Sequence, residues 1–282
     1  MQRIILFYKF VSISDTETVM HWQRAICEKL GLKGRIIISP HGINGTLGGN
    51  LKNLKYYTRE MKSHSSFEGI TYKWSEGSEQ DFPKLKVKIK PEIVAFDAAD
   101  EIVVGKNGIE NGGKHLKPAA LHRLMQERGD EVIFYDGRNK YEAQIGKFKN
   151  AVVPNTVTSR DFKKDLEEGE IAKHKDKPVV TYCTGGIRCE ILSAMMKNRG
   201  FSEVYQLDGG IVKYGEKYAD DGYWEGKLFV FDDRMKMGFS DKAQDIAECE
   251  KCGTKTSHLV NSSNVRRKLH VICEKCTSDA EV

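Results

Sequence analysis

A cysteine stands at the head of a short, glycine-containing loop that ends on an arginine. The stretch YCTGGIRCE (residues 182–190) contains Cys183, a loop of Thr184, Gly185, Gly186 and Ile187, and then Arg188. A strand is predicted before the loop and a helix after it, so the N–H groups of the loop and of the first helical turn face one point and favour an anion there. With the charge of Arg188 added, we expect Cys183 to have a lowered pKa and to be a nucleophilic thiolate. The alternative is an inert, buried cysteine at a strand end.

The length of this loop favours some reactions over others. Cysteine phosphatases enclose a phosphate with a Cys-x5-Arg loop, whereas four residues separate Cys183 from Arg188. The tighter ring suits a sulfur atom or a single oxygen better, so phosphatase chemistry is disfavoured. Cys189, in the first turn of the predicted helix, is open to two interpretations: a small packing residue, or a resolving cysteine in a redox reaction.

Two further cysteine pairs lie near the C-terminus. Twenty residues separate Cys249-x2-Cys252 from Cys273-x2-Cys276, a spacing typical of a zinc ribbon. A module of about thirty residues buries too little apolar surface to fold alone, so we expect a structural zinc held by all four thiolates. The alternative is four reduced, unliganded cysteines in a loose tail. A zinc deaminase is disfavoured because no His-x-Glu motif precedes the first pair.

Two groups of basic residues could contact RNA. In PKLKVKIKP (residues 83–91), charged and apolar residues alternate, so one strand face carries Lys84, Lys86, Lys88 and Lys90. Their spacing of about 6–7 Å is close to that of successive phosphates, which favours an RNA-binding track. The alternative is an edge strand that its lysines protect from aggregation. Between the cysteine pairs, Arg266, Arg267, Lys268 and His270 could likewise bind RNA or form a solvated hairpin tip.

The elements that must position these motifs form two patterns. In the first part of the chain we expect strands at 4–10, 34–39, 43–48, 69–74 and 85–90. A helix follows the capping box Ser14–Glu17, and another follows Asn50, each with apolar residues at helical spacing. The order β-α-β-β-α-β is that of a ferredoxin-like fold.

The second pattern alternates short strands with helices. After a glycine-rich linker at 105–118, helices are expected at 118–128, from about 140, and at 159–168, 189–199 and 210–218. The strands are expected at 131–136, 151–154, 178–182 and 203–207, with a further candidate at 228–233. This alternation predicts a parallel sheet covered on both faces, with its ligand site beyond the carboxyl ends of the strands, where Cys183 falls.

The composition is that of a globular protein, with 282 residues, 39% hydrophobic and 30% charged, and a net charge of +5. This mild basic excess is compatible with an RNA partner and does not require one. The first apolar run, Ile4 to Phe7, is too short for a signal peptide, and no stretch approaches the ~20 apolar residues of a membrane span. We therefore expect a cytoplasmic protein without membrane contact, whose cysteines serve catalysis or metal binding rather than disulfides.

Three stretches of the chain resemble the signatures of rhodanese domains. YCTGGIRCE is similar to their active-site loop, while YDGRNKYEAQIGKFKNAVVP and YQLDGGIVKYGE are similar to the segments that flank it. Together with SPHGINGTLGG and GKLFVFDDR, the chain resembles, over about residues 1–240, the rhodanese-domain tRNA uridine(34) hydroxylase family. It departs from that family at Ser262 and Arg267, where relatives commonly have additional cysteines.

The resemblance implies an enzyme that modifies tRNA. Such an enzyme converts the wobble uridine to 5-hydroxyuridine, with tRNA bound through its anticodon arm and molecular oxygen as co-substrate. Cys183 and Arg188 would then be catalytic, and Asp136, Arg138 and Cys189 would support the loop. No flavin, nicotinamide or iron motif is present, so no organic cofactor is expected. Two alternatives remain: a sulfurtransferase that carries a persulfide on Cys183, since a rhodanese fold does not determine the acceptor, or a non-catalytic adaptor.

The expected domain organisation follows from these patterns. It comprises a ferredoxin-like domain at 1–98, a linker at 99–118, a rhodanese-like catalytic domain with a parallel sheet at 119–220, and a C-terminal extension with the zinc-ribbon-like module at 221–282.

Overall fold

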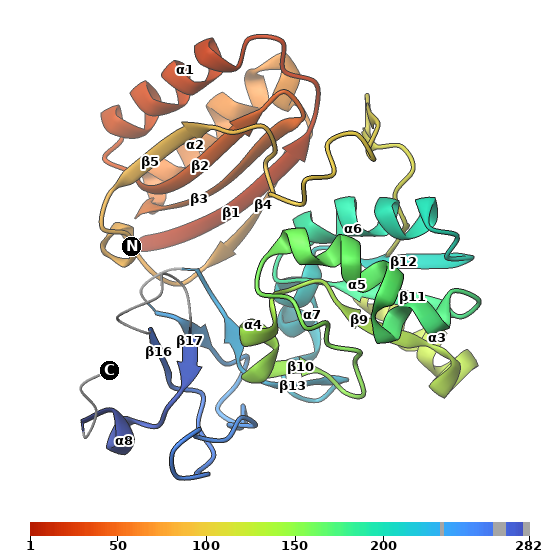
Figure 1. Cartoon of the computed structure of the whole chain (residues 1–282). Helices are drawn as coiled ribbons and strands as arrows, with labels where there is room; N and C mark the ends of the chain where they lie inside the picture. The colour runs from red at the N-terminus through yellow and green to blue at the C-terminus, as the bar shows by residue number, and fades with distance from the viewer. Residues whose placement is uncertain (232–233, 262–268, 279–282) are drawn as a thin grey trace. The chain divides into compact units, whose positions relative to one another are not determined.

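The computed structural model describes residues 1–231, 234–261 and 269–278 (Figure 1). The chain divides into two compact units, Met1–Gly112 and Gly113–Val282, and each is described by itself. Ser262, Arg266, Arg267 and Lys268, which the sequence analysis considered, lie outside the described residues. Among the described residues, no helix is both long and apolar enough to cross a membrane.

The first unit is a five-stranded sheet with two helices. Its elements are β1 (Gln2–Phe10), α1 (Thr16–Lys29), β2 (Lys33–Ser39), β3 (Gly42–Asn50), α2 (Leu51–Ser63), β4 (Thr71–Ser75), β5 (Leu85–Ile89), and a small hairpin of β6 (Val104–Gly105) and β7 (Gly108–Ile109). The sheet order is β4-β1-β3-β2-β5. Side chains of α1 and α2, among them Ile26 and Tyr57, share one core with the strands, so both helices cover the same face (Figure 1).

The sheet order confirms the ferredoxin-like fold and adds one strand to it. The pairs among β1 to β4 are all antiparallel, whereas β5 pairs in parallel with β2 and forms an edge of the sheet. The predicted alternation of β5 is confirmed: Val87 is buried in the core, while the four lysines are exposed. β5 therefore carries its lysines both on an edge and on the sheet face opposite α1 and α2.

The second unit contains a four-stranded parallel sheet in the order β8-β12-β11-β9. Its elements are β8 (Lys114–Leu116), α3 (Pro118–Arg128), β9 (Ile133–Asp136), α4 (Lys140–Gln144), β10 (Gly146–Phe148), α5 (Phe162–Glu168), β11 (Pro178–Tyr182), α6 (Ile187–Asn198), β12 (Glu203–Leu207), α7 (Gly210–Tyr218) and β13 (Trp224–Gly226). Side chains of α3 and α7 share a core with one face of the sheet, and Phe162 of α5 packs on Tyr135 from the other face, where α6 also contacts the sheet. The doubly covered sheet is confirmed.

Two expectations about this unit are wrong in part. Residues 114–116, placed in a linker by their glycine-rich surroundings, form the edge strand β8. Long-range polar contacts stabilise it there: the carboxylates of Asp208 and Glu190, 3.8 and 3.5 Å from the ring nitrogens of His115, raise its pKa to about 10. The expected strand at 151–154 is reduced to one bridge between Val152 and Tyr135, because Pro154 has no N–H with which to extend the pairing.

The C-terminal part of this unit is built from short elements. They are β14 (Leu228–Phe229), β15 (Lys236–Met237), β16 (Leu259–Asn261), β17 (Leu269–Val271) and α8 (Glu274–Ser278). The strand candidate at 228–233 is thus a two-residue strand, and Asp232 and Asp233 lie outside the described residues. Ile145, Phe229 and Val271 share a small core, which packs this part against the turn after α4.

Candidate functional site

The cysteine loop lies at the carboxyl end of β11, where the sequence pattern predicted it. Gly186 adopts a left-handed conformation (φ +98°), which a residue with a Cβ rarely adopts, and turns the chain into α6. α6 begins two residues before the predicted start, so Arg188 and Cys189 lie in its first turn. The Gly186 N–H donates a hydrogen bond to Cys183 Sγ at 3.1 Å. The loop therefore presents main-chain donors to the sulfur, as expected.

The N-terminus of α7 forms hydrogen bonds with the cysteine loop. The N–H groups of Ile211 and Val212 donate to the carbonyl oxygens of Cys183 and Thr184, at 2.9 and 3.1 Å. Gly210 makes this approach possible, because a Cβ at this position would lie 2.4 Å from the Cys183 carbonyl oxygen. These two hydrogen bonds connect the cysteine loop to the first turn of α7.

The surroundings of Cys183 lower its pKa. Burial acts to raise the pKa, but it is outweighed by a hydrogen bond from the Cys189 thiol, the positive charge of Arg188, and the N–H groups of residues 189 and 188. Together they lower the pKa of Cys183 to about 5, whereas burial and the neighbouring Cys183 raise the pKa of Cys189 well above its usual value. These shifts favour the thiolate form of Cys183 and the neutral thiol of Cys189.

The guanidinium of Arg188 is directed mainly at a carboxylate rather than at the sulfur. Its Nη1 and Nη2 donate to the two carboxylate oxygens of Glu142, at 2.6 and 2.8 Å, and Nη2 also lies 3.4 Å from Thr184 Oγ1. The Glu142 side chain has no exposed surface and that of Arg188 is 8% exposed. Glu142 lies within the stretch YDGRNKYEAQIGKFKNAVVP, but the sequence predicted no role for it. The only local signal was its position three residues after Asn139, whose N–H donates to the Glu142 carboxylate at 3.1 Å at the start of α4.

Asp136 and Arg138 form a second buried ion pair beneath the loop. Arg138 donates to both carboxylate oxygens of Asp136, at 2.9 and 2.6 Å, and to the carbonyl oxygen of Gly146. The hydroxyl of Tyr182, the residue before Cys183, donates to the same carboxylate at 2.8 Å. The ring of Trp224 lies 5.2 Å from the Arg138 guanidinium carbon. None of these contacts reaches Cys183, so the pair stabilises the strand end that carries the cysteine.

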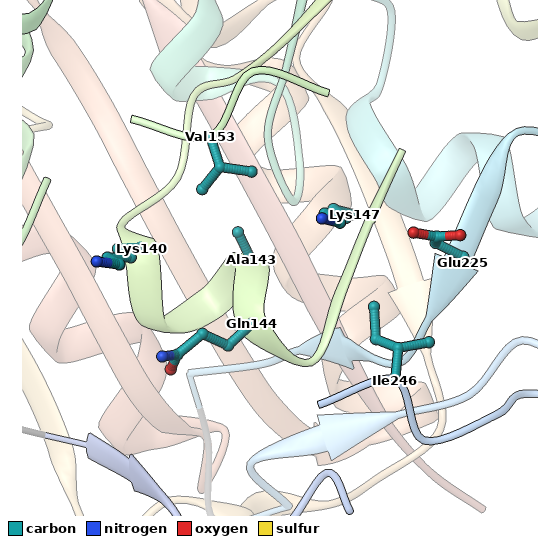
Figure 2. Close-up of a pocket in the computed structure, with 7 residues that line it drawn as sticks. All are labelled: Lys140, Ala143, Gln144, Lys147, Val153, Glu225 and Ile246. Atoms are coloured by element: carbon teal, nitrogen blue, oxygen red, sulfur yellow. The ribbon is translucent and has the colours of Figure 1, made fainter. Parts of the chain in front are cut away.

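Access to the sulfur is restricted. The Cys183 side chain has no exposed surface; of the loop, Thr184 and Ile187 are partly exposed. A hollow of about 300 Å³ lies elsewhere, along α4 and β10 (Figure 2). It is lined by Lys140, Ala143, Gln144, Lys147, Val153, Glu225 and Ile246. Cys183 is not among these residues. The candidate site is therefore the cysteine loop itself, whose sulfur is covered in this structure.

The four C-terminal cysteines form one cluster. The sulfur atoms of Cys249, Cys252, Cys273 and Cys276 all lie within 4.8 Å of one another. The Sγ atoms of Cys252 and Cys273 are 3.6 Å apart, close to the ~3.8 Å edge of a sulfur tetrahedron around a metal with 2.3 Å bonds. The N–H of Cys273 donates to Cys249 Sγ at 3.3 Å. The donor set and its spacing therefore fit a metal ion.

Three families of known proteins match successive parts of the chain, in agreement with its fold and its cysteine loop. Residues 117–217 match the family described as the rhodanese-like domain, residues 2–93 the UPF0176 acylphosphatase like domain, and residues 225–282 the family described as Rhodanase C-terminal. The parallel sheet, the cysteine loop at its carboxyl end and these matches define a rhodanese-like protein.

The curated relatives narrow the class to one family. The chain is 56% identical over 99% of its length to the tRNA uridine(34) hydroxylase of Corynebacterium kroppenstedtii, covering 94% of that protein. It is 57% identical to the protein of the same name from Corynebacterium jeikeium, over 99% of this chain and 91% of the relative. The protein of that name from an Arthrobacter species is 56% identical, over 100% of this chain and 96% of the relative. This chain belongs to the tRNA uridine(34) hydroxylase family.

Proposed function

We propose that this chain hydroxylates C5 of the wobble uridine in tRNA and that the Cys183 thiolate is its nucleophile. The observation that carries the proposal is the lowered pKa of Cys183 in a rhodanese-type loop. Membership of a family whose curated members are named for this reaction supports it. Because the substrate would be tRNA, we also infer that the protein works in the cytoplasm.

The thiolate would make C5 of uracil reactive by adding to C6. The new S–C6 bond moves the electron pair of the C5=C6 double bond toward C5 and O4, so C5 becomes the atom that attacks oxygen. Loss of the C5 proton and departure of the thiolate then restore the ring. With molecular oxygen as co-substrate, one oxygen atom is retained at C5 and the other leaves as water. The two electrons and two protons that this requires would come from an external reductant such as a dithiol, which is oxidised to a disulfide. Arg188 and the loop N–H groups stabilise the departing thiolate.

The same loop could carry a persulfide. A sulfane sulfur bound to Cys183 would be an anion, and the main-chain donors that stabilise the thiolate could stabilise it too. A sulfurtransferase therefore remains the second candidate function, with Cys183 as the carrier.

Mass spectrometry of tRNA nucleosides separates the two functions. We expect 5-hydroxyuridine and its derivatives to disappear from tRNA when the gene is deleted and to return when the intact chain is expressed. Unchanged hydroxylation in the deletion strain, together with thiosulfate-dependent formation of thiocyanate from cyanide by the purified protein, would instead select the sulfurtransferase.

The exposed lysines of β5 would bind the tRNA backbone. Lys84, Lys86, Lys88 and Lys90 are all exposed, and Arg35 of the neighbouring strand β2 lies beside Lys86 in the parallel register. The resulting positive charge on one sheet face suits the phosphates of an anticodon arm.

Reversing two of these charges should weaken tRNA binding. We expect Lys86→Glu combined with Lys88→Glu to lower tRNA affinity at least about tenfold and to reduce the slope of log K against log salt by about one to two, because up to two phosphate contacts are lost. Filter binding at several salt concentrations measures both. The exposed Lys164 of α5 provides the control variant, Lys164→Glu. Equal affinity and slope in the double variant and the wild type would contradict this role.

The cysteine cluster would hold a structural zinc ion. Four thiolates occupy every position of a tetrahedral zinc, which leaves none open for substrate. The buried core next to the hairpin of β16 and β17 and the short helix α8 is small and consists of Cys249, Ile272 and Cys273. The buried side chains of the hairpin itself, Leu259 and Val271, pack on Ile145 and Phe229 instead. Bound zinc would supply the missing stability.

Removing one ligand should release the metal. We expect about one zinc per chain in the purified protein and well below half of that in Cys276→Ser, with a lower midpoint of thermal unfolding. Elemental analysis after dialysis against a weak chelator measures the zinc. Cys27→Ala is the matched control, because Cys27 is buried in the other unit and lies far from the cluster in sequence. A wild-type protein without zinc, or a variant that keeps it, would show that this role is wrong.

A further inference from the structure

Phe231 is an exposed aromatic side chain beside the cysteine loop. Its side chain is 51% exposed, whereas Phe229, two residues earlier, is 4% exposed. Among the described residues of Gly113–Val282, Val157 is the other large hydrophobic side chain exposed to this degree, and Phe231 is the one aromatic. A phenyl ring that is half exposed gains less from burial than a core residue, so its free face is available to contact another molecule.

The ring of Phe231 faces Arg188, the last residue of the cysteine loop. Its centroid is 5.7 Å from the guanidinium carbon of Arg188, and Arg188 also contacts Thr184 of the cysteine loop. Phe231 therefore lies near Thr184, one of the two partly exposed residues of the loop.

Packing beneath the ring holds it in place. Phe229 contacts Phe231 edge to face, with centroids 5.0 Å apart and an interplanar angle of 84°. Phe229 in turn meets Tyr141 edge to face at 5.4 Å and 80°, and Tyr141 precedes Glu142, the partner of Arg188. Helix α4 thus contacts both Arg188, through Glu142, and Phe229, through Tyr141. These contacts keep the Phe231 ring close to the loop while leaving it half exposed.

A planar uracil suits this arrangement. A base that leaves the stacked anticodon loop loses contact with its neighbours, and proteins that bind unpaired bases replace that contact by stacking the base on an aromatic side chain. We propose that Phe231 stacks on the uracil of the wobble uridine and orients it toward Cys183. This inference rests on the proposed function and names the residue that binds the base in that site.

Binding of an anticodon stem-loop RNA to the full-length protein tests the inference. Two RNAs are compared by fluorescence anisotropy, one with uridine and one with an abasic residue at the wobble position. We expect wild-type protein to bind the uridine form about tenfold more tightly, the amount typical of one stacked base. Phe231→Ala should bind both forms equally, Phe231→Trp should restore the difference, and Val157→Ala, the exposed apolar control, should behave as wild type.

Other results of this binding experiment would contradict the inference. If Phe231→Ala still distinguishes the two RNAs as well as wild type, or if wild type does not distinguish them, the inference is overturned. If Phe231→Ala loses the difference and Phe231→Trp does not regain it, stacking is wrong and the residue has a structural role. The proposed function is judged separately by 5-hydroxyuridine in cellular tRNA: normal hydroxylation by wild type with an unchanged binding pattern in Phe231→Ala would overturn the inference alone.

Discussion

Replacing Cys183 with serine should lower the formation of 5-hydroxyuridine at least about a thousandfold. A serine hydroxyl stays protonated near neutral pH, so the site would lose the anion that adds to C6. The measurement is the 5-hydroxyuridine content of tRNA in a deletion strain that expresses the variant. Cys27→Ala serves as the control and should restore full modification, because burial raises the pKa of Cys27 to about 12 and leaves it an inert thiol. Full modification by Cys183→Ser would exclude a nucleophilic role for this residue.

The ionisation of Cys183 can be measured without a substrate. The difference in thiolate absorbance near 240 nm between wild type and Cys183→Ser should rise as the pH increases through about 5, because the folded protein lowers the pKa of this thiol. At neutral pH the difference should correspond to about one thiolate. Half-ionisation above about pH 8, the value of an ordinary cysteine, would mean that hydrogen bonds and charge do not outweigh burial and that the proposed nucleophile is absent.

Replacing Glu142 with alanine should destabilise the protein by about 3–5 kcal/mol, the cost typical of removing one partner of a buried ion pair. Arg188 would remain buried and charged beside an empty space, having lost two hydrogen bonds of 2.6 and 2.8 Å. Urea unfolding monitored by tryptophan fluorescence measures the change in the free energy of unfolding. Glu168→Ala is the control: the exposed pair of Glu168 with Lys164 should contribute less than about 1 kcal/mol.

Glu142→Ala should also affect the cysteine loop. Arg188 contributes to the lowered pKa of Cys183, and Glu142 holds Arg188 in its place. We therefore expect Glu142→Ala to reduce hydroxylation even at temperatures at which it is folded, and Glu142→Gln, which retains one acceptor, to reduce it less. A Glu142→Ala protein as stable and as active as wild type would show that Arg188 finds other partners and that the ion pair positions nothing.

Local patterns in the sequence were sufficient to predict the cysteine loop and most of the helices and strands. The loop from Cys183 to Arg188, the strand before it and the helix after it are consecutive in the chain, and their residue types and spacing are a property of that stretch alone. The alternation along β5 and the capping signal of α2 at Asn50 are equally short-range. The predicted capping residue of α1 is wrong by one position: Asp15, not Ser14, accepts the hydrogen bond from the Thr18 N–H, because a carboxylate caps a helix as well as a hydroxyl does. The two cysteine pairs are local only in part. The spacing within each pair is short-range, but the approach of one pair to the other was predicted only because a metal site is the usual reason for two such pairs.

The tertiary structure alone decided the contacts that complete the site. Glu142 and Arg188 are 46 residues apart, and the turn at Gly210 that holds the cysteine loop follows a different strand. β8 is an edge strand although its sequence reads as a linker, and β5 pairs in parallel with β2. Such partners depend on which strands are neighbours and on the need of each buried charge or main-chain group for a hydrogen bond, and both are set only when the whole chain has folded.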